Sequence, residues 1–142
     1  MNKMIVPFFA LVLVGCGGPT YKATLSGANE KPNAVTTNGA GNATAVLDGT
    51  VLEVSGSYQN LSGAATSAHI HGTADANNNA SVVCSLTITE SATAGTGTIA
   101  GNCDTATITA LTKANLDTNM YYVNIHTAAN AAGEIRGQLL KQ

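Results

Sequence analysis

All three histidines of the chain lie in two short segments, and their spacing suits metal coordination. His69 and His71 are two residues apart, and His126 lies in a later segment. On a β-strand, residues i and i+2 project to the same face, so these two imidazoles would lie opposite Ile70. Three neutral imidazoles are a good ligand set for copper or zinc, with a position left open for water or a substrate. The pattern therefore predicts a copper or zinc site made by His69, His71 and His126.

Further polar side chains follow the same two-residue spacing. Asn124 lies two residues before His126, and Glu134 and Arg136 flank an isoleucine in the next segment. Because apolar residues alternate with them, each segment is expected to have one polar and one apolar side. The pattern predicts one polar face on which Asn124, Glu134 and Arg136 support the three histidines. A solvated or hydrogen-bonded network without metal would use the same residues, and that alternative stays open.

The amino terminus has the pattern of an export signal. A single lysine precedes an uncharged run, residues 4–14, which is about half as long as the ~20 residues needed to span a bilayer. The run ends in a sequence that resembles the lipobox of bacterial lipoproteins, Leu13-Val14-Gly15-Cys16. We expect residues 1–15 to be a signal peptide, Cys16 to carry lipid and residues 16–20 to link the anchor to the domain. An ordinary secretory signal or a buried strand is the alternative.

This interpretation places the protein outside the cytoplasm, attached to a membrane through its lipid. Gly17 stands where an aspartate commonly retains lipoproteins in the inner membrane of enteric-type bacteria, so we expect the outer membrane where a cell has two. Three cysteines are an odd number for an exported protein. If Cys16 carries lipid, Cys84 and Cys103 remain and are expected to form a disulfide in an oxidising compartment. Two buried free thiols, or two metal ligands, are the alternatives.

The composition argues against a nucleic-acid partner and for a lean β-rich domain. Only 10% of the residues are charged, the net charge is −2, and the cationic residues after the signal are spread without a cluster. Removal of the first 15 of 142 residues leaves 127, which is enough for one domain. The chain has no tryptophan, and both phenylalanines lie in the signal. The core must therefore consist of valine, leucine, isoleucine, alanine and a few tyrosines.

Short alternating segments separated by turn residues predict an all-β fold. We expect an antiparallel, Greek-key-like sandwich or barrel in a single domain, with one short helical turn at 111–117. Asp48-Gly49 is a hairpin signal, and Val82 is expected to share the core face with Cys84. The strands are expected over residues 21–26, 42–47, 51–58, 68–72, 81–89, 95–102, 120–126 and 134–140.

Four segments of the chain resemble the CHRD (chordin) domain in order and approximate spacing. They are Leu25-Ser26-Gly27-Ala28-Asn29-Glu30-Lys31-Pro32, Ala68-His69-Ile70-His71-Gly72, Tyr122-Val123-Asn124-Ile125-His126-Thr127 and Gly133-Glu134-Ile135-Arg136-Gly137-Gln138-Leu139. The resemblance covers the mature chain and implies a CHRD domain over 21–142. The family takes its name from an extracellular antagonist of secreted growth factors and includes bacterial lipoproteins. It implies a binding or structural module whose partner is an extracellular or envelope protein. One departure is Asn130-Ala131-Ala132, where members usually have Asn-Pro.

The His-x-His segment is also similar to the copper-binding strand of copper/zinc superoxide dismutase, an exported β-sandwich with a disulfide. A dismutase copper site uses four histidines, and this chain has three, so the complete two-metal centre cannot form. Arg136 is the one candidate for guiding superoxide. We therefore expect a non-enzymatic, envelope-anchored binding or structural module, whose three-histidine face is a hydrogen-bonded network, a protein contact surface or, as its most testable elaboration, a copper or zinc site. A copper-dependent, dismutase-like redox enzyme is the alternative.

Overall fold

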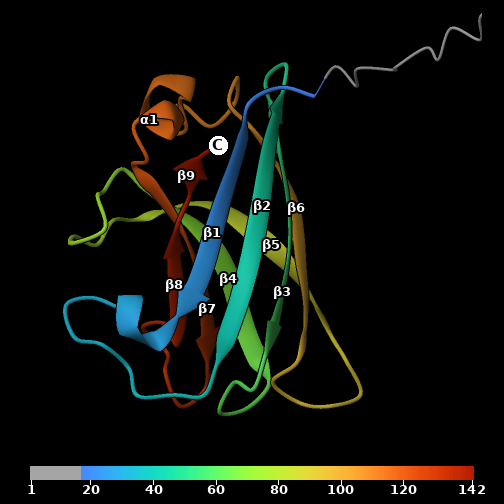
Figure 1. Ribbon diagram of the computed structural model, residues 1–142. Helices are drawn as coiled ribbons and strands as arrows, with labels where there is room; N and C mark the ends of the chain where they lie inside the picture. Colours follow the sequence, from blue (N-terminus) through green and yellow to red (C-terminus); the bar gives the residue numbers. More distant parts are fainter. Residues whose placement is uncertain (1–16) are drawn as a thin grey trace, which may run out of the picture.

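The computed structural model describes residues 17–142, and half of them lie in β-strands (Figure 1). The helical segments in this range are one 3-10 turn, η1 (Gly27–Asn29), and one short helix, α1 (Lys113–Asp117). The strands are β1 (Thr20–Ser26), β2 (Ala40–Asp48), β3 (Val51–Gln59), β4 (Ala65–Gly72), β5 (Val82–Glu90), β6 (Gly97–Asp104), β7 (Tyr121–Thr127), β8 (Ile135–Gln138) and β9 (Leu140–Lys141). The predicted all-β class is confirmed. The predicted signal peptide and the predicted lipidation site, Cys16, lie outside the described residues.

The strands close into an antiparallel barrel rather than a sandwich. Around the barrel the order is β1, β2, β3, β6, β5, β4, β7 and β8, and β9 is an additional strand beside β1. Because β3 pairs with β6 and β4 pairs with β7, the connections are Greek-key-like, as predicted. Closure removes the free edges that an open sheet would expose. Within residues 17–142, none of the helical segments has the length and apolar character needed to cross a membrane.

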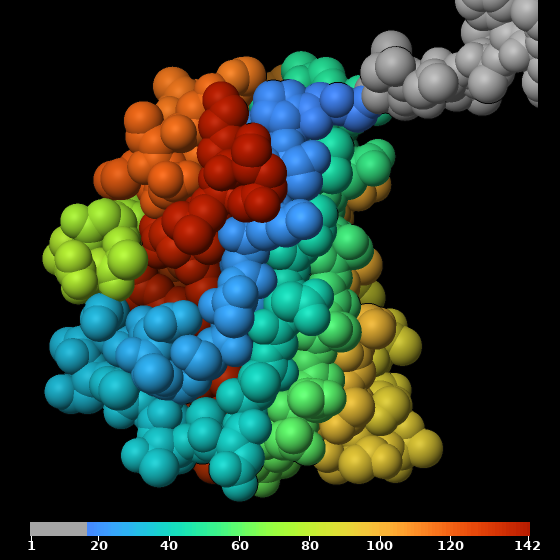
Figure 2. All heavy atoms as spheres, viewed as in Figure 1, coloured from blue at the N-terminus to red at the C-terminus, as the bar shows by residue number. Residues whose placement is uncertain are grey.

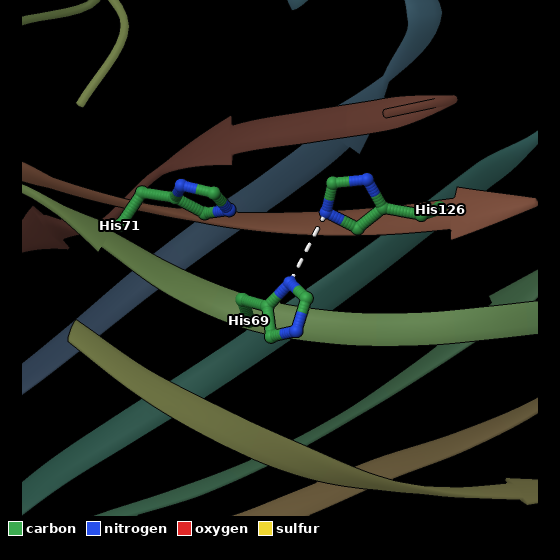
Figure 3. A group of neighbouring side chains, drawn as sticks. All are labelled: His69, His71 and His126. Carbon is green, nitrogen blue, oxygen red and sulfur yellow. Dashed lines mark hydrogen bonds between the residues drawn. The ribbon is translucent and has the colours of Figure 1, made fainter. Parts of the chain in front are cut away.

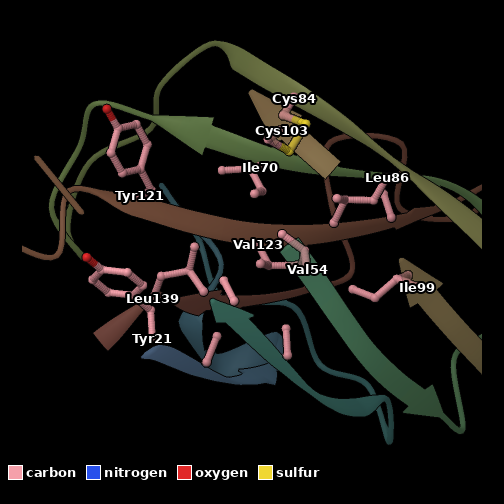
Figure 4. Close-up of a cluster of buried hydrophobic side chains, with 14 of the residues drawn as sticks. Tyr21, Val54, Ile70, Cys84, Leu86, Ile99, Cys103, Tyr121, Val123 and Leu139 are labelled. Carbon is pink, nitrogen blue, oxygen red and sulfur yellow. A yellow bond between two sulfur atoms is a disulfide. The ribbon is translucent and has the colours of Figure 1, made fainter. Parts of the chain in front are cut away.

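Alternate residues of each strand fill the barrel interior (Figure 4). Along β1, Tyr21, Ala23 and Leu25 are buried, as the alternation predicts. Full burial of each large apolar side chain contributes roughly 1.5–3 kcal/mol to folding. The Tyr21 hydroxyl donates to Asp117 Oδ1 at 2.7 Å, so its polar end is satisfied. The apolar core cluster lies wholly within residues 21–139, so residues 17–142 carry a complete barrel.

The predicted disulfide between Cys84 and Cys103 is confirmed (Figure 4). The two cysteines continue the β5–β6 register three residues beyond the Thr87–Ala100 pair. The bond therefore joins the two strands at a point where the ladder between them has ended. Both cysteines are packed in the core.

The prediction for Val82 is wrong, because β5 contains a bulge. Ile70 pairs with Cys84, but His71 pairs with Val82, which leaves Val83 as an extra residue. A bulge of this kind changes the side of the sheet on which the following residue lies. Val82 is 48% exposed instead of buried.

The predicted hairpin between β2 and β3 is present, one residue later than expected. Asp48 pairs with Val51, so the two turn residues are Gly49 and Thr50. Gly49 has a φ of 58°. Positive φ at the first central position of a two-residue hairpin favours glycine, which explains the residue found there.

The barrel closes between β1 and β8 with the help of a side chain. The ladder between these strands contains one pair, Ser26 with Arg136. Asn29, which ends η1, donates its side-chain amide to Arg136 O at 3.0 Å and to Thr24 O at 3.3 Å. One amide thus bridges the two strands where ladder bonds are missing.

Candidate metal site

Neighbouring strands place the three histidines side by side on the outer face of the barrel (Figure 3). In the β4–β7 ladder, Ser67 pairs with His126 and His69 pairs with Asn124. His69 and His126 are therefore diagonal neighbours, a relation in which long side chains can meet. His71 lies two residues further along β4, next to the β5 bulge.

The imidazoles are close enough to share one ion. The ring centroids lie 5.1 Å apart for His69 and His126, 5.7 Å for His69 and His71, and 5.9 Å for His71 and His126. One ligand nitrogen from each ring lies within 4.8 Å of the other two. Nitrogens bound tetrahedrally at 2.0–2.1 Å from zinc lie roughly 3.3–3.5 Å apart, so the nitrogens need to approach one another by at most about 1.5 Å.

Two backbone carbonyls fix the orientation of His71 and His126. His71 Nδ1 lies 2.9 Å from Ala80 O, and His126 Nδ1 lies 3.0 Å from Ala131 O. A carbonyl oxygen only accepts hydrogen bonds, so the proton of each neutral ring is on Nδ1 and the lone pair is on Nε2. Metal-binding histidines are commonly held in this way, with the second ring nitrogen donating to a carbonyl or carboxylate.

The free lone pairs point toward one another and toward His69. His69 Nδ1 lies 3.2 Å from His126 Nε2 and donates to it (Figure 3). His71 Nε2 is buried and has no hydrogen-bond partner among the described residues. A buried polar atom without a partner is costly, at roughly 1–3 kcal/mol. An ion between the rings would satisfy this nitrogen.

Burial keeps the three imidazoles neutral. His71 and His126 are 9% and 8% exposed, whereas His69 is more accessible, so the group opens to solvent beside His69. Burial lowers the pKa of each histidine, and the repulsion between His126 and a second protonated ring lowers the pKa of His69 and His71 further. Neutral rings present a lone pair to a metal without first losing an added proton.

Arg136 is linked to the histidine site indirectly, through the ring of Tyr122. The His71 ring is stacked on the Tyr122 ring, with centroids 4.9 Å apart and an interplanar angle of 5°. The Arg136 guanidinium, from the strand on the other side of β7, lies 3.5 Å from the centre of the Tyr122 ring. It donates to Asn79 Oδ1 and Asn78 O at 2.8 Å. Arg136 therefore holds both Tyr122 and the loop whose Ala80 carbonyl orients His71.

Asn124 contacts a buried carboxyl group that the sequence patterns did not single out. Its amide lies 3.5 Å from Glu30 Oε2, and Glu30 is 3% exposed. Burial raises the pKa of Glu30 to about 7, while Arg136 and the Asn124 amide act in the opposite direction. Glu30 comes from the long loop after η1, where two-residue spacing carries no information about neighbours. Its place in the first of the four segments that resemble the CHRD domain was the available signal.

Glu134 lies apart from the imidazoles. Its carboxylate accepts hydrogen bonds from Thr37 Oγ1, Ser62 N and Oγ, and Thr127 Oγ1, at 2.6–2.8 Å. The residue precedes β8, so strand alternation does not place its side chain beside that of Arg136. Of the six residues predicted for the polar face, the structure thus groups the three histidines, with Asn124 and Arg136 on the neighbouring strands, and places Glu134 in a separate cluster.

Of the three comparisons with known proteins, the one with protein-family models found a match. No curated protein and no solved structure matched the chain. The family model of the CHRD domain matches residues 21–139, which span the barrel from β1 to the end of β8 and include all three histidines. On this match over most of its length, the chain belongs to the CHRD domain family.

Proposed function

We propose that this chain is an exported, non-enzymatic binding module that holds copper or zinc through His69, His71 and His126. The observation that carries the proposal is the buried Nε2 of His71, which has no hydrogen-bond partner among residues 17–142, in a group of three rings that each have one nitrogen within 4.8 Å of the others. Membership of the CHRD family supports a binding or structural module. The bound metal is the more specific part of the proposal, and it rests on the geometry of the three histidines.

The hydrogen bonds assign one ligand atom to each residue. His71 and His126 would bind through Nε2, because their Nδ1 atoms donate to Ala80 O and Ala131 O. His69 would bind through Nδ1, which faces His126 Nε2, and its proton would move to Nε2. His69 is the most accessible of the three, so its ring has the most freedom to close around the ion. The hydrogen-bonded pair of His69 and His126 is then the metal-free state of the site.

The ligand chemistry favours copper over zinc as the tighter ion. Imidazole suits both metals, and divalent copper binds a given nitrogen site more tightly than zinc in the usual order of stability. All three ligands are neutral, so they do not offset the positive charge of a bound divalent ion. The open coordination position would face the solvent beside His69. Attachment through Cys16 would keep the module outside the cytoplasm.

Isothermal titration calorimetry of residues 17–142 with Cu(II) and with Zn(II) tests the metal site. We expect one ion per chain, with a Kd below 1 µM for Cu(II) and a weaker one for Zn(II). His71→Ala should weaken Cu(II) binding at least tenfold, because one of three ligands is lost. Ser85→Ala is the matched control, since Ser85 is exposed and pairs with His69 on the neighbouring strand. Binding weaker than micromolar, or equal affinity for the His71 variant, would refute the site.

A superoxide assay on the copper-loaded domain separates the binding module from a redox enzyme. We expect no turnover beyond that of the same amount of free copper, since the chain has three histidines where a dismutase copper site has four. Turnover that is lost in His71→Ala and kept in Ser85→Ala would replace the binding module with the dismutase-like enzyme.

A further inference from the structure

A cleft lies on the outside of the barrel, over the outward side chains of β1 and of the segment that contains β8 and β9. β1 pairs with β8 at Ser26–Arg136 and, in the same register, with β9 at Lys22–Leu140, and no ladder pairs are formed between these two points. The cleft holds about 800 Å³ and is lined by outward side chains of both strands, by residues 75–77 and by the turn after α1. Figure 2 shows this face, where the yellow-green loop 75–77, the blue loop after η1 and the red C-terminal strands surround it. Its volume suits a ligand the size of one or two sugar rings.

The cations of residues 17–142 that form no salt bridge all line the cleft. Among residues 17–142, Lys113 and Lys141 form salt bridges with Asp117, and the remaining cations are Lys22, Lys31 and Arg136. All three of these line the cleft. With Asp75 as the only acidic side chain in the lining, the local charge is +2, opposite in sign to the −2 of the chain. A surface of this sign attracts an anion.

The one carboxylate in the cleft is turned toward its own loop. Asp75 Oδ1 accepts hydrogen bonds from Asn77 N at 2.9 Å and from Asn78 Nδ2 at 2.8 Å. Arg136 is buried beneath the same loop and donates to its carbonyl groups. Lys22 and Lys31 are therefore the cations that a ligand can contact directly, while Arg136 adds its charge from below.

An anion by itself would leave part of the cleft unsatisfied. Gln138 donates through Nε2 to Ala74 O and Asn119 O, and its Oε1 is buried without a partner among the described residues. An oxyanion has only acceptors and cannot pair with Oε1, whereas a hydroxyl group can donate to it. Most of the remaining lining is amide and hydroxyl, and its two apolar side chains are Ala76 and Leu140. A polar, hydroxylated ligand fits this lining better than an apolar one.

We propose that the cleft binds a sugar that carries a phosphate or carboxylate group, either as a free sugar or at the end of a glycan. Lys22 and Lys31 pair with the oxyanion, and the sugar hydroxyls exchange hydrogen bonds with Gln138 and the surrounding amides. Leu140, which is 49% exposed, packs against the C–H face of the ring. This site is separate from the three histidines and requires no metal.

Backbone amide NMR of residues 17–142, titrated in the presence of EDTA, tests the proposal. The probes are glucose 6-phosphate and glucuronate for free sugars, trigalacturonate for a glycan end, and glucose and inorganic phosphate for the two halves of the ligand. We expect at least one anionic sugar to shift the amides of Lys22, Asn77 and Asn119, with a Kd at least tenfold lower than those of glucose and phosphate. The tighter of the free sugar and trigalacturonate identifies the source of the ligand.

Two variants test whether the anionic sugar binds in the cleft. Lys22→Gln combined with Lys31→Gln should weaken binding of the anionic sugar at least tenfold. Lys113→Gln removes one charge from the Asp117 cluster and should leave the Kd unchanged. The proposal is overturned if no anionic sugar binds, if phosphate or glucose binds as tightly, or if the Lys22 and Lys31 changes have no effect. Since the titration contains no metal, these results leave the histidine site untouched.

Discussion

At the scale of single residues, Glu134 is a fully buried carboxylate held by neutral donors. It is 0% exposed and forms no salt bridge with a cation of residues 17–142. Its bonds come from three different connections: Thr37 in the loop after η1, Ser62 between β3 and β4, and Thr127 at the end of β7. The carboxylate thus ties together one end of the barrel. Burial alone would raise the pKa of Glu134, but these hydrogen bonds lower it from 4.5 to about 2.

Replacement of Glu134 by glutamine should destabilise the barrel in a pH-dependent way. At pH 7 we expect a loss of about 2 kcal/mol or more in the free energy of unfolding, because an amide cannot accept from all of these donors. The lowered pKa means that the ionised group stabilises the fold above pH 4.5, and this contribution is lost as the pH falls toward about 2. Urea unfolding at pH 7 and at steps down to pH 2 measures both effects.

The exposed Glu53→Gln variant provides the control for Glu134→Gln. Glu53 lies on the outer face of β3, and a surface change of this kind should alter stability by less than about 0.5 kcal/mol at either pH. A difference between wild type and Glu134→Gln that stayed constant down to pH 2 would contradict the role given to the carboxylate.

At the scale of strands, the disulfide joins β5 and β6 at a point where no ladder hydrogen bonds connect them. The bond closes a loop with a sequence separation of 19 residues, for which the chain-entropy model gives about 3 kcal/mol. Reduction with dithiothreitol should therefore lower the urea midpoint of the wild-type domain. The double variant Cys84→Ala, Cys103→Ala should unfold at a lower midpoint that dithiothreitol does not change. If reduction left the wild-type midpoint in place, the bond would not stabilise the native state.

The strand pattern could be predicted because alternation is a local property. Tyr21, Ala23 and Leu25 show it in β1, and the spacing of His69 and His71 placed both on one face. The choice between barrel and sandwich could not be predicted, because it depends on how β1 meets β8, more than a hundred residues later in the chain. Val82 was misplaced since a bulge changes the alternation without a clear mark in the sequence.

The environment of the candidate site was less predictable than its ligands. The three histidines are the only ones in the chain, so a shared site could be anticipated from composition and spacing. The carbonyls of Ala80 and Ala131, which orient two of the rings, belong to loops and carry no side-chain signal. Glu134 was expected near Arg136 because strand alternation was extended one residue before β8 begins. Loop geometry, rather than strand geometry, thus accounts for what the pattern missed.

At the scale of the whole molecule, the chain enters the barrel at the end that carries the β2–β3 hairpin (Figure 1). Pro19 O accepts a hydrogen bond from Leu47 N at 3.0 Å, so only Gly17 and Gly18 separate Cys16 from the sheet. Fully extended, this connection spans about 10 Å. A lipid on Cys16 would therefore hold the barrel close to the membrane surface, with the Glu134 end pointing away from it.

The proposed anchor makes a prediction that depends on two adjacent residues. In an enteric-type host, Cys16→Ser should abolish labelling with radioactive palmitate and move the protein from the membrane to the soluble fraction, because the sulfur that accepts the lipid is lost. Gly17→Asp should keep the label but shift the protein from the outer to the inner membrane. Since no atom of the described residues lies within 4 Å of a Cβ atom added at Gly17, the second change should leave the barrel intact. Membrane attachment that survives Cys16→Ser would refute the lipid anchor, and outer-membrane location that survives Gly17→Asp would refute the sorting argument alone.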